Sequence, residues 1–265
     1  MSLAAPKIDP LFEQGVAEFV QTGRTVLNLP HPPCIQAAVD GVRALISSPE
    51  RDQWTFFVPR HGEPNDEPDD GLVRKGKTHT YEKTDNKWFF HYRPSLRGHL
   101  AKHNVQTDSY GEMLLAAGDY LHRYYENMVL RIADALDLHL PGYRIPDLMR
   151  HEAGRSVNVL RILAYDQGCA ATNVNNIVAR PHTDRDFLTF HIANSRDGLH
   201  LGPEREPYAV QPGKLLAFAG QKLERLTRGH IKAVQHDVQD PDGAAPDGRW
   251  SMVFFSHIPG KNGYL

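Results

Sequence analysis

The most regular pattern in the chain is an apolar stripe over residues 109–136. Its members recur every three or four residues, at Leu114, Ala117, Leu121, Tyr124, Met128, Ile132 and Leu136. This spacing places them along one side of an α-helix, so we predict a long helix with one buried face. The helix is expected to end at residues 140–143 (LPGY), and its tyrosines are expected to pack against a sheet: Tyr120, Tyr124 and Tyr125.

A shorter helix is predicted from Cys34 to the Ser47-Ser48-Pro49 sequence, because proline interrupts the helical hydrogen-bond pattern. Between the two helices, residues 61–71 (HGEPNDEPDDG) are polar and contain proline and glycine. We interpret this segment as a solvated loop, and its acidic run as part of that loop and not as a metal site.

The pattern changes from about residue 157 onward. Short runs rich in β-branched and aromatic residues are separated by Gly, Pro and Asp, at 157–165, 187–192, 214–219, 230–238 and 250–258. Several runs are apolar on both faces, which indicates a sheet covered by helices on one side and closed on the other. The chain is therefore predicted to be mainly β with flanking α-helices, with a core resembling a jelly roll.

Composition narrows the possible classes of protein. The chain has 265 residues, 40% hydrophobic and 23% charged, which is typical of a globular protein with one large or two small domains. A net charge of -2 gives no electrostatic reason to expect nucleic acid or an anionic membrane as partner. No apolar run approaches the ~20 residues of a membrane span, and the first residues lack the apolar segment of a secretory signal. The two cysteines, Cys34 and Cys169, are far apart, so no disulfide framework is expected and a cytoplasmic location is predicted.

The candidate chemistry begins with His182-Thr183-Asp184. Residues two apart on a strand point to the same side, so this imidazole and carboxylate can face one ion. Two imidazoles and a carboxylate hold Fe(II) on one face of an octahedron and leave three positions open. The triplet alone carries little information, because about one His-x-Asp is expected by chance with 15 histidines in the chain. His236 is the candidate second imidazole, far enough along the chain for several strands to return to the same place.

Two further groups are candidate carboxylate binders. Arg249 and Ser251 lie two apart on a predicted strand, so a guanidinium fork and a hydroxyl face the same side. Tyr165 ends an earlier predicted strand and can offer its hydroxyl to a second carboxylate. The sequence thus predicts metal ligands and dicarboxylate binders in the same β half.

These segments resemble the isopenicillin N synthase-like family of Fe(II)/2-oxoglutarate oxygenases, which includes the plant-type dioxygenases. The resemblance is strongest in residues 181–201, 210–238 and 249–257. Matching details include the Leu-Thr after the His-x-Asp triplet, Gly198-Leu199, Pro212-Gly213, Gly220, Leu223, Thr227, Gly229, Lys232 and the Arg-x-Ser. Residues 85–94 and 133–143 match more loosely.

The resemblance implies a double-stranded β-helix, with roles for particular residues. His182, Asp184 and His236 match the iron ligands, and Arg249 and Ser251 match the pair that binds the distal carboxylate of 2-oxoglutarate. Tyr165 matches the tyrosine of an Asn-x-Tyr motif, although Leu163 stands where asparagine is usual. Residues 1–150 are then the helical and β flanking region that lines the substrate pocket. Residues 151–265 are the β core with the iron site, within one structural unit.

The implied activity is oxidation of a small molecule with Fe(II), 2-oxoglutarate and O₂. Hydroxylation, desaturation or ring closure would proceed through Fe(IV)=O, with release of succinate and CO₂. No nucleic-acid or membrane partner is expected. Two alternatives stay open: an iron oxidase of the same fold that does not use 2-oxoglutarate, and a non-catalytic β-barrel binding protein. A halogenase is disfavoured, because Asp184 occupies the position that a halide requires.

Several other residues of the β runs can reach the cavity. For His191, His230 and His257, we expect a packing or surface position ahead of a role in the cavity. Arg161 shares strand parity with Tyr165, so it can face the cavity or serve a structural role. His91 and Arg93 lie in a segment that borders the substrate pocket in the family, and they are minor candidates for substrate contact.

Overall fold

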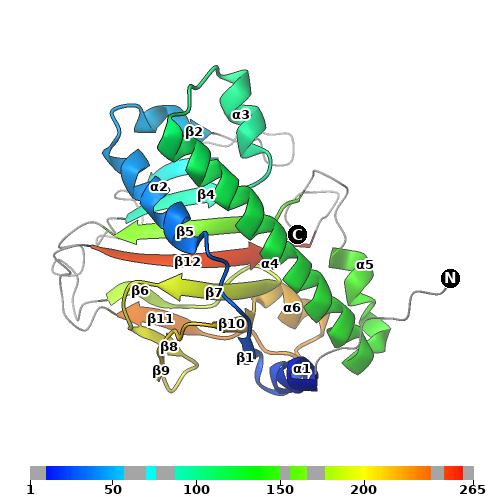
Figure 1. The fold of residues 1–265 in the computed structure, drawn as a ribbon. Helices are drawn as coiled ribbons and strands as arrows, with labels where there is room; N and C mark the ends of the chain where they lie inside the picture. Colours follow the sequence, from blue (N-terminus) through cyan, green and yellow to red (C-terminus); the bar gives the residue numbers. More distant parts are fainter. Residues whose placement is uncertain are drawn as a thin grey trace.

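The computed structural model of the chain describes residues 10–56, 70–75, 87–149, 156–165, 177–239 and 248–258. Within them, two antiparallel sheets form the centre of the molecule (Figure 1). The large sheet contains, in spatial order, β1 (Arg24–Asn28), β10 (Lys214–Ala219), β7 (Leu188–Asn194), β12 (Arg249–Ser256), β5 (Val159–Tyr165), β4 (Lys87–Tyr92), β3 (Asp70–Lys75) and β2 (Thr55–Phe56). The small sheet contains β6 (Ile177–His182), β11 (His236–Gln239), β8 (Leu199–Leu201) and β9 (Glu206–Tyr208).

Helices cover one face of the large sheet, where α4 runs across the strands with α2 beside it (Figure 1). The described helices are α1 (Pro10–Thr22), α2 (Ile35–Ser47), α3 (Leu96–Lys102), α4 (Ser109–His139), α5 (Ile145–Met149) and α6 (Gln221–Leu226), with short 3-10 turns η1 (Arg51–Trp54) and η2 (Pro141–Tyr143). This arrangement confirms the predicted double-stranded β-helix with flanking helices. None of the described helices combines the length and hydropathy that crossing a bilayer requires.

The long helix was predicted with nearly correct bounds. Asp108 caps it by accepting a hydrogen bond from the backbone N–H of Gly111 at 2.7 Å. The predicted stripe is buried except at Tyr124, which is half-buried. Tyr125 is the buried tyrosine, and its ring centre lies 6.1 Å from that of Phe190 and 6.0 Å from that of Phe254. The prediction was wrong at Tyr124, because Tyr125 falls one turn after Leu121 on the side that meets the sheet. It was also wrong at Tyr120, which is 53% exposed.

Four of the five predicted strand runs form strands: β10 with the predicted bounds, and β5, β7 and β12 with shifted ends. The run 230–238 was wrong over residues 230–235, because only His236 onward belongs to a strand. Before it, Arg228 and Gly229 have φ of 52° and 80°, which strand geometry does not allow. The hydroxyl of Thr227 accepts a hydrogen bond from the backbone N–H of Ile231 at 3.1 Å and fixes this turn.

The end of the segment predicted as a solvated loop is a buried strand. Residues 61–69 lie outside the described residues, but Asp70 and Gly71 begin β3, and Asp70 is 1% exposed. The Asp70 carboxylate forms an ion pair with Arg93 and accepts a hydrogen bond from Ser95 at 3.0 Å. A buried guanidinium requires an anionic partner. Asp70 is therefore buried although the sequence around it is polar.

Strands β1 to β4 come from the first 150 residues, yet they pair with the β core in one sheet. β4 pairs with β5, and β1 pairs with β10 at the far edge. The predicted boundary at residue 150 therefore runs through a continuous sheet, and the division into a flanking region and a core stays a prediction.

Candidate functional site

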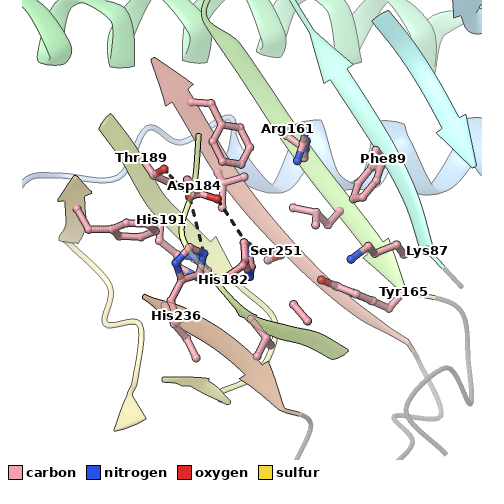
Figure 2. A pocket seen from close by; sticks show the side chains of 17 residues that line it. Lys87, Phe89, Arg161, Tyr165, His182, Asp184, Thr189, His191, His236 and Ser251 are labelled. Carbon is pink, nitrogen blue, oxygen red and sulfur yellow. Dashed lines mark hydrogen bonds and ion pairs between the residues drawn. The ribbon is translucent and has the colours of Figure 1, made fainter. Parts of the chain in front are cut away.

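Two histidines meet where neighbouring strands of the small sheet pair. His182 ends β6, His236 begins β11, and they are direct partners across the ladder, with ring centres 4.3 Å apart. Asp184 follows two residues after His182, and its two carboxylate oxygens lie 3.6 Å from His182 Nε2 and 3.7 Å from His236 Nε2. One ligand atom from each residue lies within 4.8 Å of the others. The structure thus brings together the three residues predicted as ligands (Figure 2).

Backbone carbonyls orient both imidazoles. The Nδ1 of His182 lies 2.6 Å from the carbonyl oxygen of Arg180, and the Nδ1 of His236 lies 3.2 Å from that of Val234. A carbonyl only accepts, so each Nδ1 carries the proton and each Nε2 keeps its lone pair for the site. Burial lowers the pKa of His236, although the charge of Asp184 acts in the opposite direction. The buried imidazole is therefore neutral at pH 7, the form that binds a metal ion.

Thr189, on β7, fixes the carboxylate of Asp184. Its hydroxyl oxygen lies 2.6 Å from Asp184 Oδ2 and 2.8 Å from Asp186 Oδ2. A hydroxyl has one proton, so it donates to one carboxyl group and accepts from the other. Burial, followed by the charge of Asp184, raises the pKa of Asp186 well above its ordinary value. The Thr189 hydroxyl, which lies between the two carboxyl groups, therefore fixes the orientation of the Asp184 carboxylate.

The segment 184–186 is also anchored through its backbone. The N–H groups of Gln221 and Lys222, in the first turn of α6, donate to the carbonyls of Asp184 at 2.8 Å and Asp186 at 3.0 Å. A side chain at Gly220 would place its Cβ 2.1 Å from Asp186 Oδ1, so this close approach requires glycine. Sequence reasoning gave no role to Asp186 or Thr189. What the sequence did show is that both residues lie close to the His-x-Asp triplet.

The face of the large sheet opposite α4 forms the other wall of the site. Strand register places Lys87, Tyr165 and Arg249 side by side in one row across β4, β5 and β12. The next row contains Phe89, Leu163 and Ser251. The following row contains His91, Arg161, Val253 and His191. Since these positions alternate along their strands, all of them project toward the small sheet.

A cavity lies between this wall and the three clustered residues (Figure 2). It is lined by Lys87, Phe89, Arg161, Leu163, Tyr165, Ala179, His182, Asp184, Thr189, His191, Leu199, Phe218, His236, Val238, Ser251, Val253 and Phe255. Ser251 and Tyr165, two of the three predicted carboxylate binders, thus line the cavity, and Arg249, the third, is not among the lining residues. Arg249 is 4% exposed beside Tyr165, and its Nη1 donates to the carbonyl oxygen of Asp197 at 2.6 Å.

His191 is more than a packing histidine. It is 5% exposed, lines the cavity, and its Nε2 is buried without a hydrogen-bond partner among the described residues. Burial, followed by the charge of Arg249, lowers its pKa to about 3, so the ring is neutral at pH 7. Buried polar atoms are almost always hydrogen-bonded, so this nitrogen indicates a place for a polar ligand group.

Of the other candidate residues, some lie at the cavity wall and the others have a structural or surface position. Arg161 faces the cavity, and its Nε donates to His91 Nε2 at 2.8 Å. Arg93 forms the ion pair with Asp70 instead of lining the cavity. His230 is exposed, and His257 is not among the residues that line the cavity, so neither contributes a described contact to the site.

Comparison with protein-family models matches residues 157–258 to the 2OG-Fe(II) oxygenase superfamily. A comparison with curated proteins gave no match. Among solved structures, a candidate oxygenase from Shewanella oneidensis is similar with a TM-score of 0.70 at 17% identity, covering 96% of this chain and 88% of that one. A full-length protein from Neurospora crassa, solved in complex with alpha-KG, has a TM-score of 0.69 at 18% identity, with coverages of 96% and 83%. The dioxygenase for auxin oxidation from Arabidopsis thaliana, in complex with 2-oxoglutarate, has a TM-score of 0.67 at 14% identity, with coverages of 96% and 91%.

The chain therefore carries a 2OG-Fe(II) oxygenase domain. The predicted function of an Fe(II)- and 2-oxoglutarate-dependent oxygenase is confirmed at the level of this domain, and so are its cofactors, Fe(II), 2-oxoglutarate and O₂. The structural likenesses support the fold. These comparisons do not assign roles to individual residues of this chain.

Proposed function

We propose that the 2OG-Fe(II) oxygenase domain of this chain binds Fe(II) through His182, Asp184 and His236 and oxidises a small molecule. The observation that carries the proposal is the convergence of two imidazoles and one carboxylate within 4.8 Å. Both Nε2 atoms point into the site because their Nδ1 atoms are held by backbone carbonyls. This donor set fits Fe(II), and it leaves the side toward the cavity for exchangeable ligands.

The same proposal assigns the binding of 2-oxoglutarate to Arg249, Ser251 and Tyr165. Arg249 and Ser251 lie in successive rows of one strand face, and Tyr165 is the cross-strand partner of Arg249. Arginine binds a carboxylate through two parallel hydrogen bonds, which a buried position strengthens. The Nε2 of His191, which has no hydrogen-bond partner among the described residues, fits this ligand, because a 2-oxoglutarate oxygen within the cavity would satisfy it.

The residues of the chain have distinct parts in the reaction. Bound iron supplies the activation of O₂, with 2-oxoglutarate consumed to succinate and CO₂. The chain of hydrogen bonds through Asp186 and Thr189 holds Asp184 in one orientation. The buried wall around Ser251 excludes water, which strengthens the interaction of Arg249 with an anion. Hydroxylation, desaturation or ring closure would then take place at the substrate carbon that the cavity wall holds nearest to His182, Asp184 and His236.

We further propose membership of the isopenicillin N synthase-like subfamily, a small-molecule substrate and a cytoplasmic location. The ordered matches over residues 181–257 support the subfamily. Among the structural neighbours, the Neurospora crassa protein has also been solved with thymine, a small molecule. The described part of the chain contains Cys34 as a free thiol, which is consistent with a reducing compartment.

The test is turnover of 2-oxoglutarate by the purified protein supplied with Fe(II), O₂ and a cell extract. We expect succinate and CO₂ in equal amounts, together with an extract compound that gains one oxygen atom or loses two hydrogens. O₂ consumption with substrate oxidation but without succinate would identify an oxidase of the same fold. Absence of iron-dependent O₂ consumption would contradict the enzymatic function.

A further inference from the structure

Strand β7 ends with a buried polar atom that no described contact satisfies. Asn194 is the last residue of β7 and the direct partner of Ser251 on β12. Its side-chain Nδ2 is buried and has no hydrogen-bond partner among the described residues. Buried polar atoms are almost always hydrogen-bonded, so this amide indicates a place for a polar group of a ligand.

A β-bulge turns Asn194 toward the side of the cavity. His191 and Asn194 are three residues apart on β7, whereas their partners on β12, Val253 and Ser251, are two apart. Residues three apart on a regular strand project to opposite faces, but the extra residue of the bulge restores the same face for both. His191 and Ser251 line the cavity (Figure 2), so Asn194 projects toward the same side of the sheet.

The residue after Asn194 is anchored to β12, which fixes where the amide lies. The backbone N–H of Ser195 donates to the carbonyl oxygen of Trp250 at 3.0 Å, and the hydroxyl of Ser195 accepts from the backbone N–H of Trp250 at 3.0 Å. Asn194 is therefore directly opposite Ser251 and diagonal to Arg249, positions from which long side chains reach each other. Like Arg249, Asn194 does not line the cavity itself, and both lie next to Ser251, which does.

The order of the polar residues along β7 leads from the metal site to Asn194. Thr189 contacts Asp184, and His191 follows two residues later. Asn194 ends the strand beside Ser251. A ligand that extends from the metal site along β7 therefore has its far end at Asn194.

A carboxylate at this far end can accept one hydrogen bond more than the proposed binders supply. Its two oxygens accept about four hydrogen bonds. The guanidinium fork of Arg249 would supply two of them, and the hydroxyl of Ser251 a third. The amide of Asn194, next to Ser251, can supply the fourth.

We propose that Asn194 is a further binding residue for the distal carboxylate of 2-oxoglutarate, to which its Nδ2 donates a hydrogen bond beside Arg249 and Ser251. The inference rests on the proposed function, because it assumes that this carboxylate lies at Arg249 and Ser251. The amide adds a donor without adding a charge. Asn194 therefore contributes to the selection of a 2-oxo acid with a second carboxylate over one that ends in a methyl group.

The test measures binding without turnover. The wild type and its variants are loaded with Fe(II) under anaerobic conditions and titrated by calorimetry with 2-oxoglutarate and with 2-oxopentanoate, which has a methyl group in place of the distal carboxylate. Asn194→Leu keeps the approximate shape of the side chain but removes the amide. We expect it to weaken 2-oxoglutarate binding about 10- to 100-fold, the usual range for a hydrogen bond to a charged group, and to leave 2-oxopentanoate binding unchanged.

A second variant, Asn194→Asp, tests the same contact through charge. It keeps the size of the side chain but places a negative charge beside the distal carboxylate, so we expect a larger loss of 2-oxoglutarate affinity than in Asn194→Leu, again without a change for 2-oxopentanoate. This variant decides if Asn194→Leu does not fold. Fe(II) affinity is measured in every variant and should be unchanged, whereas a purely structural role of Asn194 would alter it.

The matched control is Asn28→Leu. Asn28 also ends its strand, β1, but its amide oxygen accepts a hydrogen bond from Lys214 at the edge of the large sheet. This variant should bind Fe(II) and both acids as the wild type does.

The two proposals fail in different ways. If 2-oxoglutarate does not bind to the wild type, the proposed function is wrong. If it binds, but the folded Asn194 variants bind it as the wild type does or lose affinity for both acids to the same extent, the role of Asn194 is wrong and the proposed function stands.

Discussion

The two faces of the large sheet differ in what their residues do, although the same strands supply both. On β12, Met252 and Phe254 face the helices, and Phe254 packs against Tyr125 and His122 of α4. The alternating residues Ser251 and Val253 face the cavity. Alternate positions of a strand thus serve packing and chemistry. A shift of the strand register by one residue would turn the packing residues toward the cavity and the cavity residues toward the helices.

Asp184→Gly should abolish succinate formation, because two imidazoles alone hold Fe(II) weakly and leave its geometry undefined. The measurement is product analysis by mass spectrometry, with wild type and variant both assayed in high chloride. The wild type should give hydroxylated, desaturated or cyclised product and no chlorinated product. Chlorination by the wild type would contradict the role of Asp184 as an iron ligand.

The helix-facing side should affect stability and not chemistry. Phe254→Ala removes a fully buried ring, and we expect a loss of about 3–5 kcal/mol in the free energy of unfolding, measured by denaturant titration. Below its melting transition the variant should keep wild-type affinity for Fe(II).

The matched variant is Phe255→Ala, because Phe255 is the next residue of β12 and faces the cavity instead of the helices. Phe255 is half-buried, so we expect a smaller loss of stability but weaker binding of substrate at the cavity. The separation of the two faces would be refuted if both variants had the same effect on stability and on binding.

Arg249→Leu should weaken 2-oxoglutarate binding by roughly 30- to several thousand-fold, or ~2–5 kcal/mol, because a carboxylate loses its partner in a sheltered pocket. Arg249→Lys should restore only part, since an ammonium group cannot form the two parallel hydrogen bonds. The apparent Michaelis constant for 2-oxoglutarate reports the change. An unaltered constant in Arg249→Leu would indicate an oxidase that does not use it.

Thr189→Val should have the smallest effect among these variants. It keeps the shape of the side chain but removes the hydroxyl that holds Asp184, and we expect Fe(II) affinity to fall about 10- to 100-fold. Thr25→Val is the control, because Thr25 is also buried but donates to Glu18, away from the site. Equal Fe(II) affinity in the two variants would show that the hydrogen bond to Asp184 is not needed.

The features predicted correctly from the sequence depend on residues close together in the chain. The helix of residues 109–139 follows from its periodicity. His182 and Asp184 were located by a recognisable motif, but Asp184 lies beyond the end of β6, so the predicted strand alternation does not account for its position. His236, Arg249 and Ser251 were located by the ordered series of family matches, and their strand register agrees with a shared site.

What the sequence did not reveal depends on contacts between distant segments. Strand β2 has two residues, too few for a periodic pattern, and it belongs to the sheet only through its pairing with β3. Asp70 was predicted to be part of a polar loop, because its buried partner Arg93 is distant in the sequence and no local pattern identifies it. The Nε2 of His191 has no hydrogen-bond partner in the part of the chain that the structure describes, and this too depends on the surroundings of the residue, which no local pattern encodes.

We propose that His182, Asp184 and His236 hold one Fe(II), which 2-oxoglutarate then chelates. The most direct measurement is an anaerobic titration of the metal-free protein with Fe(II) and then with 2-oxoglutarate, following bound iron and the visible absorption of the chelate. We predict one Fe(II) per chain and an absorption band that appears only with 2-oxoglutarate, and neither in folded His236→Ala. Full iron binding and the same band in His236→Ala would contradict the account.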